Sequence, residues 1–149
     1  MDQYNLNRFI EAQMVIYEGA MLELARGRKD SHWVWYIFPQ IEGLGNSETI
    51  KLYAIKSLEE GRAYLKHPVL GQRLIKACEI LLSLKDASMD EVMGFPDDLK
   101  LLSSMTLFEA LSDSNSIFTK VIDVYFDSER DEISLKLIKE LLKKEYDAF

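Results

Sequence analysis

The side chains best suited to binding or catalysis are concentrated between Gly27 and Ser47. This stretch contains both tryptophans, one of the two histidines and three of the seven glycines of the 149-residue chain. Basic residues precede an aromatic run, and a polar segment with two glycines follows it. An apolar wall beside a few polar groups is the usual composition of a small-molecule pocket. We therefore expect this stretch to contribute to a ligand site.

His32 is the candidate catalytic residue of this stretch. In the sequence it stands between the basic residues Arg28 and Lys29 and the aromatic run. Histidine side chains ordinarily change charge near neutral pH, which suits a general acid or base. The alternative is a structural role, in which the ring bonds to a neighbouring carbonyl group and shapes the loop.

Trp33 and Trp35 are two positions apart, so their roles depend on the local structure. On a strand the two indoles would share a face, whereas on a helix they would lie about 200° apart. In the helical case one indole could line a pocket while the other enters the core. We expect at least one of them in the core, and the other is available to stack on a ring of a ligand.

The segment from Gly43 to Ser47 offers two alternatives. Its backbone N–H groups could bind an anion if a helix begins directly after Ser47. A plain turn, with Ser47 as the helix cap, is the other alternative. A nucleotide-binding fingerprint would need more glycines and a preceding strand, so the turn is favoured.

A second polar group interrupts an apolar segment later in the chain. Ser103, Ser104 and Thr106 follow Lys100, and Lys100 is three or four residues from the two serines, which places them on one face of a helix. Hydroxyl groups inside a helix either bond to carbonyl groups one turn earlier or face a polar pocket. The pocket alternative would bring Lys100 into the same site.

These observations predict a site for a small anionic or nucleotide-derived ligand, with the two segments facing each other across a hollow. Lys29 or Lys100 would hold the anionic group. No metal or cofactor is expected, because two histidines and one cysteine without close spacing do not form a zinc site. The predicted ligand-binding residues are Lys29, Trp33, Gln40, Gly43, Gly45, Ser47, Lys100, Ser103, Ser104 and Thr106.

The elements that would position these residues are helices. Apolar residues recur at three- and four-residue steps, which predicts an all-α, compact single domain over residues 1–149 with about seven to eight helices. Ser31–Phe38 is ambiguous between strand and helix, and a short buried helix that stops before Pro39 is preferred. Residues 48–53 form another short helix or an extended piece. The remaining helices are expected at 6–26, 57–65, 68–84, within 86–94, and at 99–111, 114–126 and 131–146.

Several residues are suited to the ends of these helices. Asn5 is expected to cap the first helix, and Gly27 to end it in the left-handed conformation. Ser57 and Glu60 have capping-box spacing. Pro68 suits the first turn of the helix that follows it. The remaining caps are expected at Ser88 and at Asp97 or Asp98.

The composition limits the classes of partner and compartment. A net charge of −7 provides no general basic face, so nucleic acid is not an expected partner. No apolar run approaches the roughly 18 residues of a membrane-spanning helix, and the first residues lack the features of a secretory signal. A single cysteine, Cys78, rules out an internal disulfide, which fits the cytoplasm. The oligomeric state stays open.

Three segments resemble a known bacterial family. They are Ser-His-Trp-Val-Trp-Tyr-Ile-Phe-Pro-Gln with Gly-Leu-Gly-Asn-Ser (31–47), Tyr-Leu-Lys-His-Pro-Val-Leu-Gly-Gln-Arg-Leu (64–74) and Pro-Asp-Asp-Leu-Lys-Leu-Leu-Ser-Ser-Met-Thr-Leu-Phe (96–108). In this order they resemble the uncharacterised domain-of-unknown-function family 1810. The resemblance implies a compact, mostly helical domain and brings no established activity, cofactor or catalytic residue.

Two further comparisons bear on function. The family is often labelled calpastatin, but a calpastatin-type inhibitor is disordered and low in aromatic residues, whereas 11% of this chain is aromatic. The helical character and the aromatic–histidine motif are also similar to helical domains proposed to handle NAD and ADP-ribose derivatives. That similarity implies a hydrolase of such metabolites as one form of the predicted function.

A protein-interaction module without catalytic activity is the alternative to a ligand site. In that case the aromatic run would form either core or an exposed patch for a partner. A contiguous exposed apolar patch of several hundred Å² would favour this alternative. Whether the chain is an enzyme stays open at the level of the sequence.

Overall fold

A computed structural model describes residues 2–148 and contains nine helices within them. No strand is assigned in this part of the chain, which confirms the all-α class. The helices are α1 (Asn7–Ala25), α2 (Val34–Ile37), α3 (Glu48–Leu52), α4 (Leu58–Lys66), α5 (Leu70–Ser83), α6 (Met89–Val92), α7 (Asp97–Ala110), α8 (Ile117–Tyr125) and α9 (Glu132–Asp147).

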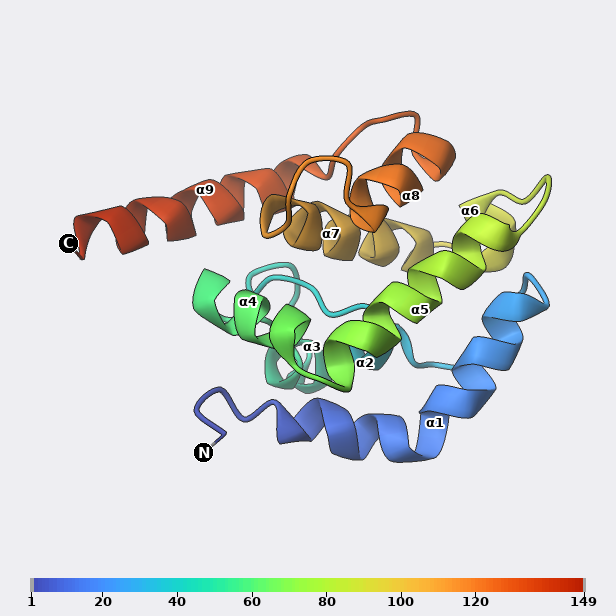
Figure 1. Cartoon of the computed structure of the whole chain (residues 1–149), viewed down its shortest axis with the longest axis horizontal. Helices are drawn as coiled ribbons and strands as arrows, with labels where there is room; N and C mark the ends of the chain where they lie inside the picture. The colour runs from blue at the N-terminus through green and yellow to red at the C-terminus, as the bar shows by residue number, and fades with distance from the viewer. Residues whose placement is uncertain (1, 149) are drawn as a thin grey trace.

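Helix α5 runs through the middle of the molecule, and α1, α4 and α8 pack against it (Figure 1). In that view α1 follows the lower edge, and α7, α8 and α9 form the opposite edge. A chain of touching rings crosses the core between them: Phe9 on α1 contacts Tyr64 on α4, which contacts Phe108 on α7. Phe118 on α8 continues the chain, and every centroid separation lies between 5.1 and 5.7 Å. These buried aromatic contacts join the two edges into one core.

The two ambiguous segments are both helical. Residues 34–37 form the short buried helix that the sequence favours, and it ends ahead of Pro39. Residues 48–52 form α3, and Ser47 caps it by accepting a hydrogen bond from the N–H of Ile50 at 3.1 Å. Because both segments are helices, the described residues contain nine helices instead of the expected seven or eight.

Three of the expected helix ends are confirmed. Gly27 has φ +77° directly after α1, the left-handed conformation that glycine adopts at low cost. Ser57 caps α4 by accepting the N–H of Glu60 at 3.0 Å. Ser88 caps α6 in the same way, accepting the N–H of Glu91 at 3.2 Å.

Two N-terminal caps differ from the prediction because another side chain supplies the acceptor. Asn5 does not cap α1; the carboxylate of Asp2 accepts the N–H groups of Leu6 and Asn7 at 2.7 and 2.8 Å. Pro68 lies in the turn before α5, and Nδ1 of His67 accepts the N–H groups at the start of that helix at 3.1 and 3.2 Å.

Helix α7 starts two residues earlier than expected, at Asp97. The carboxylate of Asp97 is therefore free of capping and pairs with lysines instead. This difference matters for the site, because it places an acid where only basic and hydroxyl groups were expected.

Among residues 2–148, none of the helices combines the length and the apolar character that crossing a bilayer requires.

Candidate functional site

Glu23 fixes the backbone that leads into the aromatic run. Its carboxylate accepts hydrogen bonds from the N–H of Asp30, the N–H and hydroxyl of Ser31, and the indole N–H of Trp33, at 2.7 to 2.9 Å. Burial alone would raise the pKa of Glu23, but these hydrogen bonds outweigh it and lower the pKa to about 2. The carboxylate therefore stays charged and holds residues 30–33 against α1.

Lys29 and Lys100, from distant segments of the sequence, meet at one carboxylate. The ammonium group of Lys29 lies 2.6 Å from Oδ2 of Asp97, and that of Lys100 lies 3.2 Å from Oδ1. The two lysines hold the pKa of Asp97 below its usual range, against the effect of burial. We call these three residues the lysine–aspartate cluster. It joins the 27–47 stretch to α7.

Each ammonium group of the cluster also lies over an indole ring. Lys29 is 5.3 Å from the centroid of Trp33, and Lys100 is 4.8 Å from that of Trp35. Trp33 is 1% exposed and belongs to the core, whereas Trp35 is half-buried. The Lys29 side chain is 5% exposed and Lys100 is 24% exposed, so solvent reaches the cluster from the Lys100 side.

Two buried donors, one on α2 and one on α7, have no hydrogen-bond partner among residues 2–148. They are Nε1 of Trp35 and the hydroxyl of Ser104. Ser104 is fully buried and lies one helical turn after Lys100, on the same face of α7. Buried polar groups are nearly always hydrogen-bonded, so such donors indicate an acceptor outside the protein itself, either a buried water molecule or a ligand.

Ser103 and Thr106, two other predicted residues, anchor α9. Their hydroxyls bond to the carbonyl groups of Leu99 and Leu102, one turn earlier. The Ser103 hydroxyl also reaches the carboxylate of Asp131 at 3.3 Å, and Thr106 accepts the N–H of Asp131 at 3.1 Å. The structure therefore follows the first of the two alternatives for these residues and uses them to attach the start of α9 to α7.

The 43–47 segment is a turn. Gly43 has φ +111°, and a Cβ atom there would come within 3.2 Å of Leu137 on α9. At Gly45 a Cβ atom would come within 2.7 Å of Ile50. Both glycines are thus explained by backbone conformation and close packing, and Ser47 by its capping of α3.

Neither Gln40 nor His32 takes part in the ion pairs of the lysine–aspartate cluster. Gln40 lines a small hollow with Trp35 and Tyr53, of about 10 Å³, which is the volume one water molecule needs. His32 is exposed, and its ring takes no part in the hydrogen bonds by which Glu23 holds its neighbours. The structure brings Lys29 and Lys100 together at Asp97, with the Trp33 ring beside the ammonium group of Lys29, whereas Gly43 of the turn faces α9.

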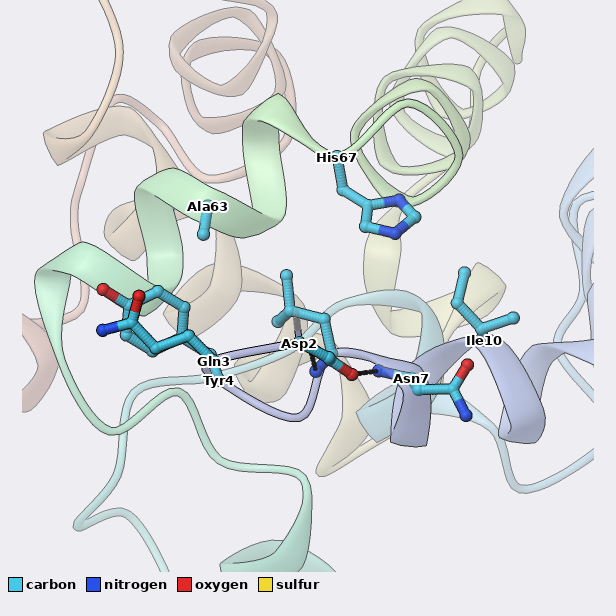
Figure 2. A pocket seen from close by; sticks show the side chains of 8 residues that line it. Asp2, Gln3, Tyr4, Asn7, Ile10, Ala63 and His67 are labelled. Atoms are coloured by element: carbon cyan, nitrogen blue, oxygen red, sulfur yellow. Dashed lines mark hydrogen bonds between the residues drawn. The ribbon is translucent and has the colours of Figure 1, made fainter.

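Three hollows of about 500 Å³ lie elsewhere, and none of the predicted site residues lines them. The first, of about 530 Å³, lies between the N-terminal segment and α4, and its lining includes Asp2, Asn7, Ile10 and His67 (Figure 2). The second, of about 500 Å³, lies between α1 and α5. The third, of about 490 Å³, lies between α4 and α9.

Sequence reasoning missed the residues of segment 64–74 that line the first two hollows. Pro68, Gln72 and Arg73 line the second, and His67 lines the first. The signal in the sequence is the grouping of histidine, glutamine and arginine around a proline that separates two helices. Cys78 is not part of any site: burial raises the pKa of its thiol, and it packs 3.7 Å from the sulfur of Met105.

No group of three or more histidine, cysteine, aspartate or glutamate side chains within residues 2–148 is arranged to hold a metal ion.

Comparison with known proteins assigns a family. The model of a family described as "Protein of unknown function (DUF1810)" matches residues 3–138. A solved structure, that of the conserved hypothetical protein Rv1873 from Mycobacterium tuberculosis, is 41% identical and superposes with a TM-score of 0.89. The match covers 91% of this chain and 97% of that one. A search of curated proteins found no match. This chain therefore belongs to the DUF1810 family of proteins of unknown function.

Proposed function

We propose that this protein binds a small oxyanion-bearing molecule, such as a nucleotide-derived phosphate, where α2 meets α7. The observation that carries the proposal is the pair of buried donors, Nε1 of Trp35 and the hydroxyl of Ser104, beside Lys100. An oxyanion offers several acceptors in a small volume and would satisfy both donors. Hydrogen bonds to an ionised group are also about twice as strong as neutral ones.

The charges of the cluster support an anionic ligand. Two lysines share the single carboxylate of Asp97, which leaves one positive charge in excess at the contact. Lys29 also donates to the carbonyl of Ser31, so its role is structural. Lys100 has Asp97 as its only hydrogen-bond partner among residues 2–148 and is the more exposed lysine, so it is the residue that would hold the anion.

A ligand at this contact would enter from the solvent side of Lys100. Trp33 would keep its place in the core, and Trp35 would donate its indole N–H to the ligand. His32 is exposed and its ring takes part in none of the hydrogen bonds around Glu23, so the proposal assigns it no role in binding. Nucleotide-derived ligands such as ADP-ribose are the class to test first.

The experiment is a calorimetric titration of wild-type protein and Ser104→Ala with inorganic phosphate and with ADP-ribose. The substitution removes one unpaired donor, so we expect about tenfold weaker binding. The free energy of unfolding should not fall, because a buried hydroxyl without a partner contributes nothing to stability. Ser103→Ala is the matched control: it should lower stability through the loss of the Asp131 contact and leave binding unchanged.

Two results would count against the proposal. One is the absence of saturable binding to wild-type protein by either compound. The other is binding that Ser103→Ala and Ser104→Ala weaken to the same extent. Either result would favour the interaction-module alternative, for which the exposed apolar side chains Met14, Val15 and Leu22 of α1 are the surface to study.

A further inference from the structure

Arg73 differs from every other arginine of the chain in its electrostatic environment. Five of the six arginines have a carboxylate oxygen within 4.0 Å. Arg73 has none among residues 2–148, although it is half-buried. Arg8 shows the usual arrangement: its guanidinium makes five hydrogen bonds, one of them to the buried carboxylate of Glu60 at 2.6 Å.

The Arg73 guanidinium is nevertheless held in a fixed orientation. It lies 4.4 Å from the centroid of the Tyr17 ring, and it donates one hydrogen bond to Oε1 of Gln13 at 3.2 Å. Gln13 is itself 1% exposed and donates to the carbonyl of Tyr36 at 2.7 Å. These contacts position the fork of N–H donors and leave four of its five N–H groups without an acceptor in the described residues.

Arg73 lines the hollow between α1 and α5, which run side by side (Figure 1). The hollow has a volume of about 500 Å³, within the range of small-molecule sites. Its charged side chains carry a net charge of +1, from Arg73 and Lys76 against Glu79. The full lining is Tyr17, Pro68, Val69, Gln72, Arg73, Ile75, Lys76 and Glu79.

We propose that this hollow is a second binding site, which takes a small organic carboxylate or phosphate ester with an apolar body. The planar guanidinium fork matches the geometry of two oxygens of a carboxylate or phosphate. Lys76 and Gln72 stand beside it as further donors. Val69 and Ile75 provide the apolar surface on which the body of the ligand lies. The site is distinct from the contact of α2 with α7.

The simplest alternative is that Arg73 only packs α5 against α1. A structural arginine would need the stacking on Tyr17 and the bond to Gln13, but it would not respond to an added anion. The test must therefore read out the free donors themselves. Nitrogen-15 NMR resolves the Nε–H signals of arginines, and it does so in the intact wild-type protein.

The experiment titrates the protein with benzoate, phenyl phosphate and inorganic phosphate. We expect the Arg73 Nε–H signal to shift saturably with benzoate or phenyl phosphate. The compound that binds more tightly shows whether the site prefers a carboxylate or a phosphate. Arg73→Lys keeps the charge but loses the fork, so affinity should fall about tenfold. Arg62→Lys is the matched control, because Arg62 is already paired with Glu145 at 2.9 Å and its replacement should leave affinity unchanged.

Lys76→Glu provides a second variant that does not depend on the fold around Tyr17. It reverses a charge at the rim and should also weaken binding about tenfold. The proposal is overturned if the Arg73 signal does not move with any of the three compounds. It is equally overturned if Arg62→Lys weakens binding as much as Arg73→Lys. Ser104→Ala should leave this binding unaffected, so the two sites stand or fall separately.

Discussion

At the scale of single residues, Glu23 is the strongest organiser of the 27–47 stretch. Its carboxylate is almost buried and accepts four hydrogen bonds from residues 30, 31 and 33. In the unfolded chain its pKa would be near 4.5, whereas folding lowers it to about 2. Because the folded pKa is the lower one, the charged form contributes stability above about pH 4.5, and that contribution is lost as the pH falls towards 2.

Glu23→Gln should therefore lower the free energy of unfolding at neutral pH by about 2 kcal/mol, because a buried carboxylate that accepts four hydrogen bonds is lost. The amide replaces an acceptor by a donor opposite groups that are themselves donors. Urea unfolding at pH 7 and at about pH 2.5 measures the effect. The difference between wild type and variant should shrink at the lower pH, and a difference that is independent of pH would contradict this account.

Residue types in the sequence identify part of the lysine–aspartate cluster but not its chemistry. Lys29 and Lys100 were expected at one site, and they do meet at Asp97. That they bind a ligand together with Trp33 and Ser104 stays a prediction. Asp97 was expected as a helix cap, because an aspartate near a helix start usually is one. Local sequence patterns do not show that Lys29, from a distant segment, forms an ion pair with the carboxylate of Asp97. Trp33 was predicted among the ligand-binding residues, whereas it lies in the core. The unpaired N–H of Trp35 is visible only in the structure.

At the scale of elements, the close contact between α4 and α5 depends on Gly71. A Cβ atom at this position would lie 2.1 Å from the backbone carbonyl oxygen of Leu65, and backbone cannot move aside as a side chain can. Gly19 lies in the middle of α1, where an added Cβ atom would meet nothing within 4 Å. The same substitution therefore has opposite expected effects in two helices.

Gly71→Ala should destabilise the fold by about 3 kcal/mol or more, since it forces two helices apart. Gly19→Ala should be neutral or stabilise it by up to about 1 kcal/mol, because alanine loses less backbone freedom in a helix. Thermal unfolding of the two variants beside wild type measures both. Equal losses in stability would show that the α4–α5 contact is not the constraint described above.

The elements were largely predictable because each carries a local signal. In the long helices apolar residues recur every three or four positions. The capping serines Ser57 and Ser88 each accept the N–H of the residue three positions later. The start of α5 was missed because proline at the first turn is the common pattern, whereas here the ring nitrogen of His67 accepts both N–H groups. Histidine is not among the residues that commonly cap a helix start, so its presence there did not predict the cap.

At the scale of the whole molecule, the all-α fold class could be predicted from the sequence, whereas the positions of the three large hollows could not. The hollow between α1 and α5 combines Tyr17 with residues from 68 to 79. The Arg73 side chain in it is oriented by a hydrogen bond to Gln13, sixty residues earlier in the sequence. Such a site arises only where distant helices meet, so periodicity within one segment contains no information about it. The lack of a carboxylate beside Arg73 among the described residues is likewise a property of the assembled structure.

The central claim is that an oxyanion accepts the indole N–H of Trp35 at the contact of α2 with α7. The chain has two tryptophans, so a nitrogen-15 correlation spectrum has two indole signals, and Trp35→Phe assigns them. During titration with ADP-ribose or phosphate, the Trp35 signal should shift saturably, while that of Trp33, bonded to Glu23 at 2.9 Å, should stay. A Trp35 signal that does not move at any concentration of either compound would contradict the account.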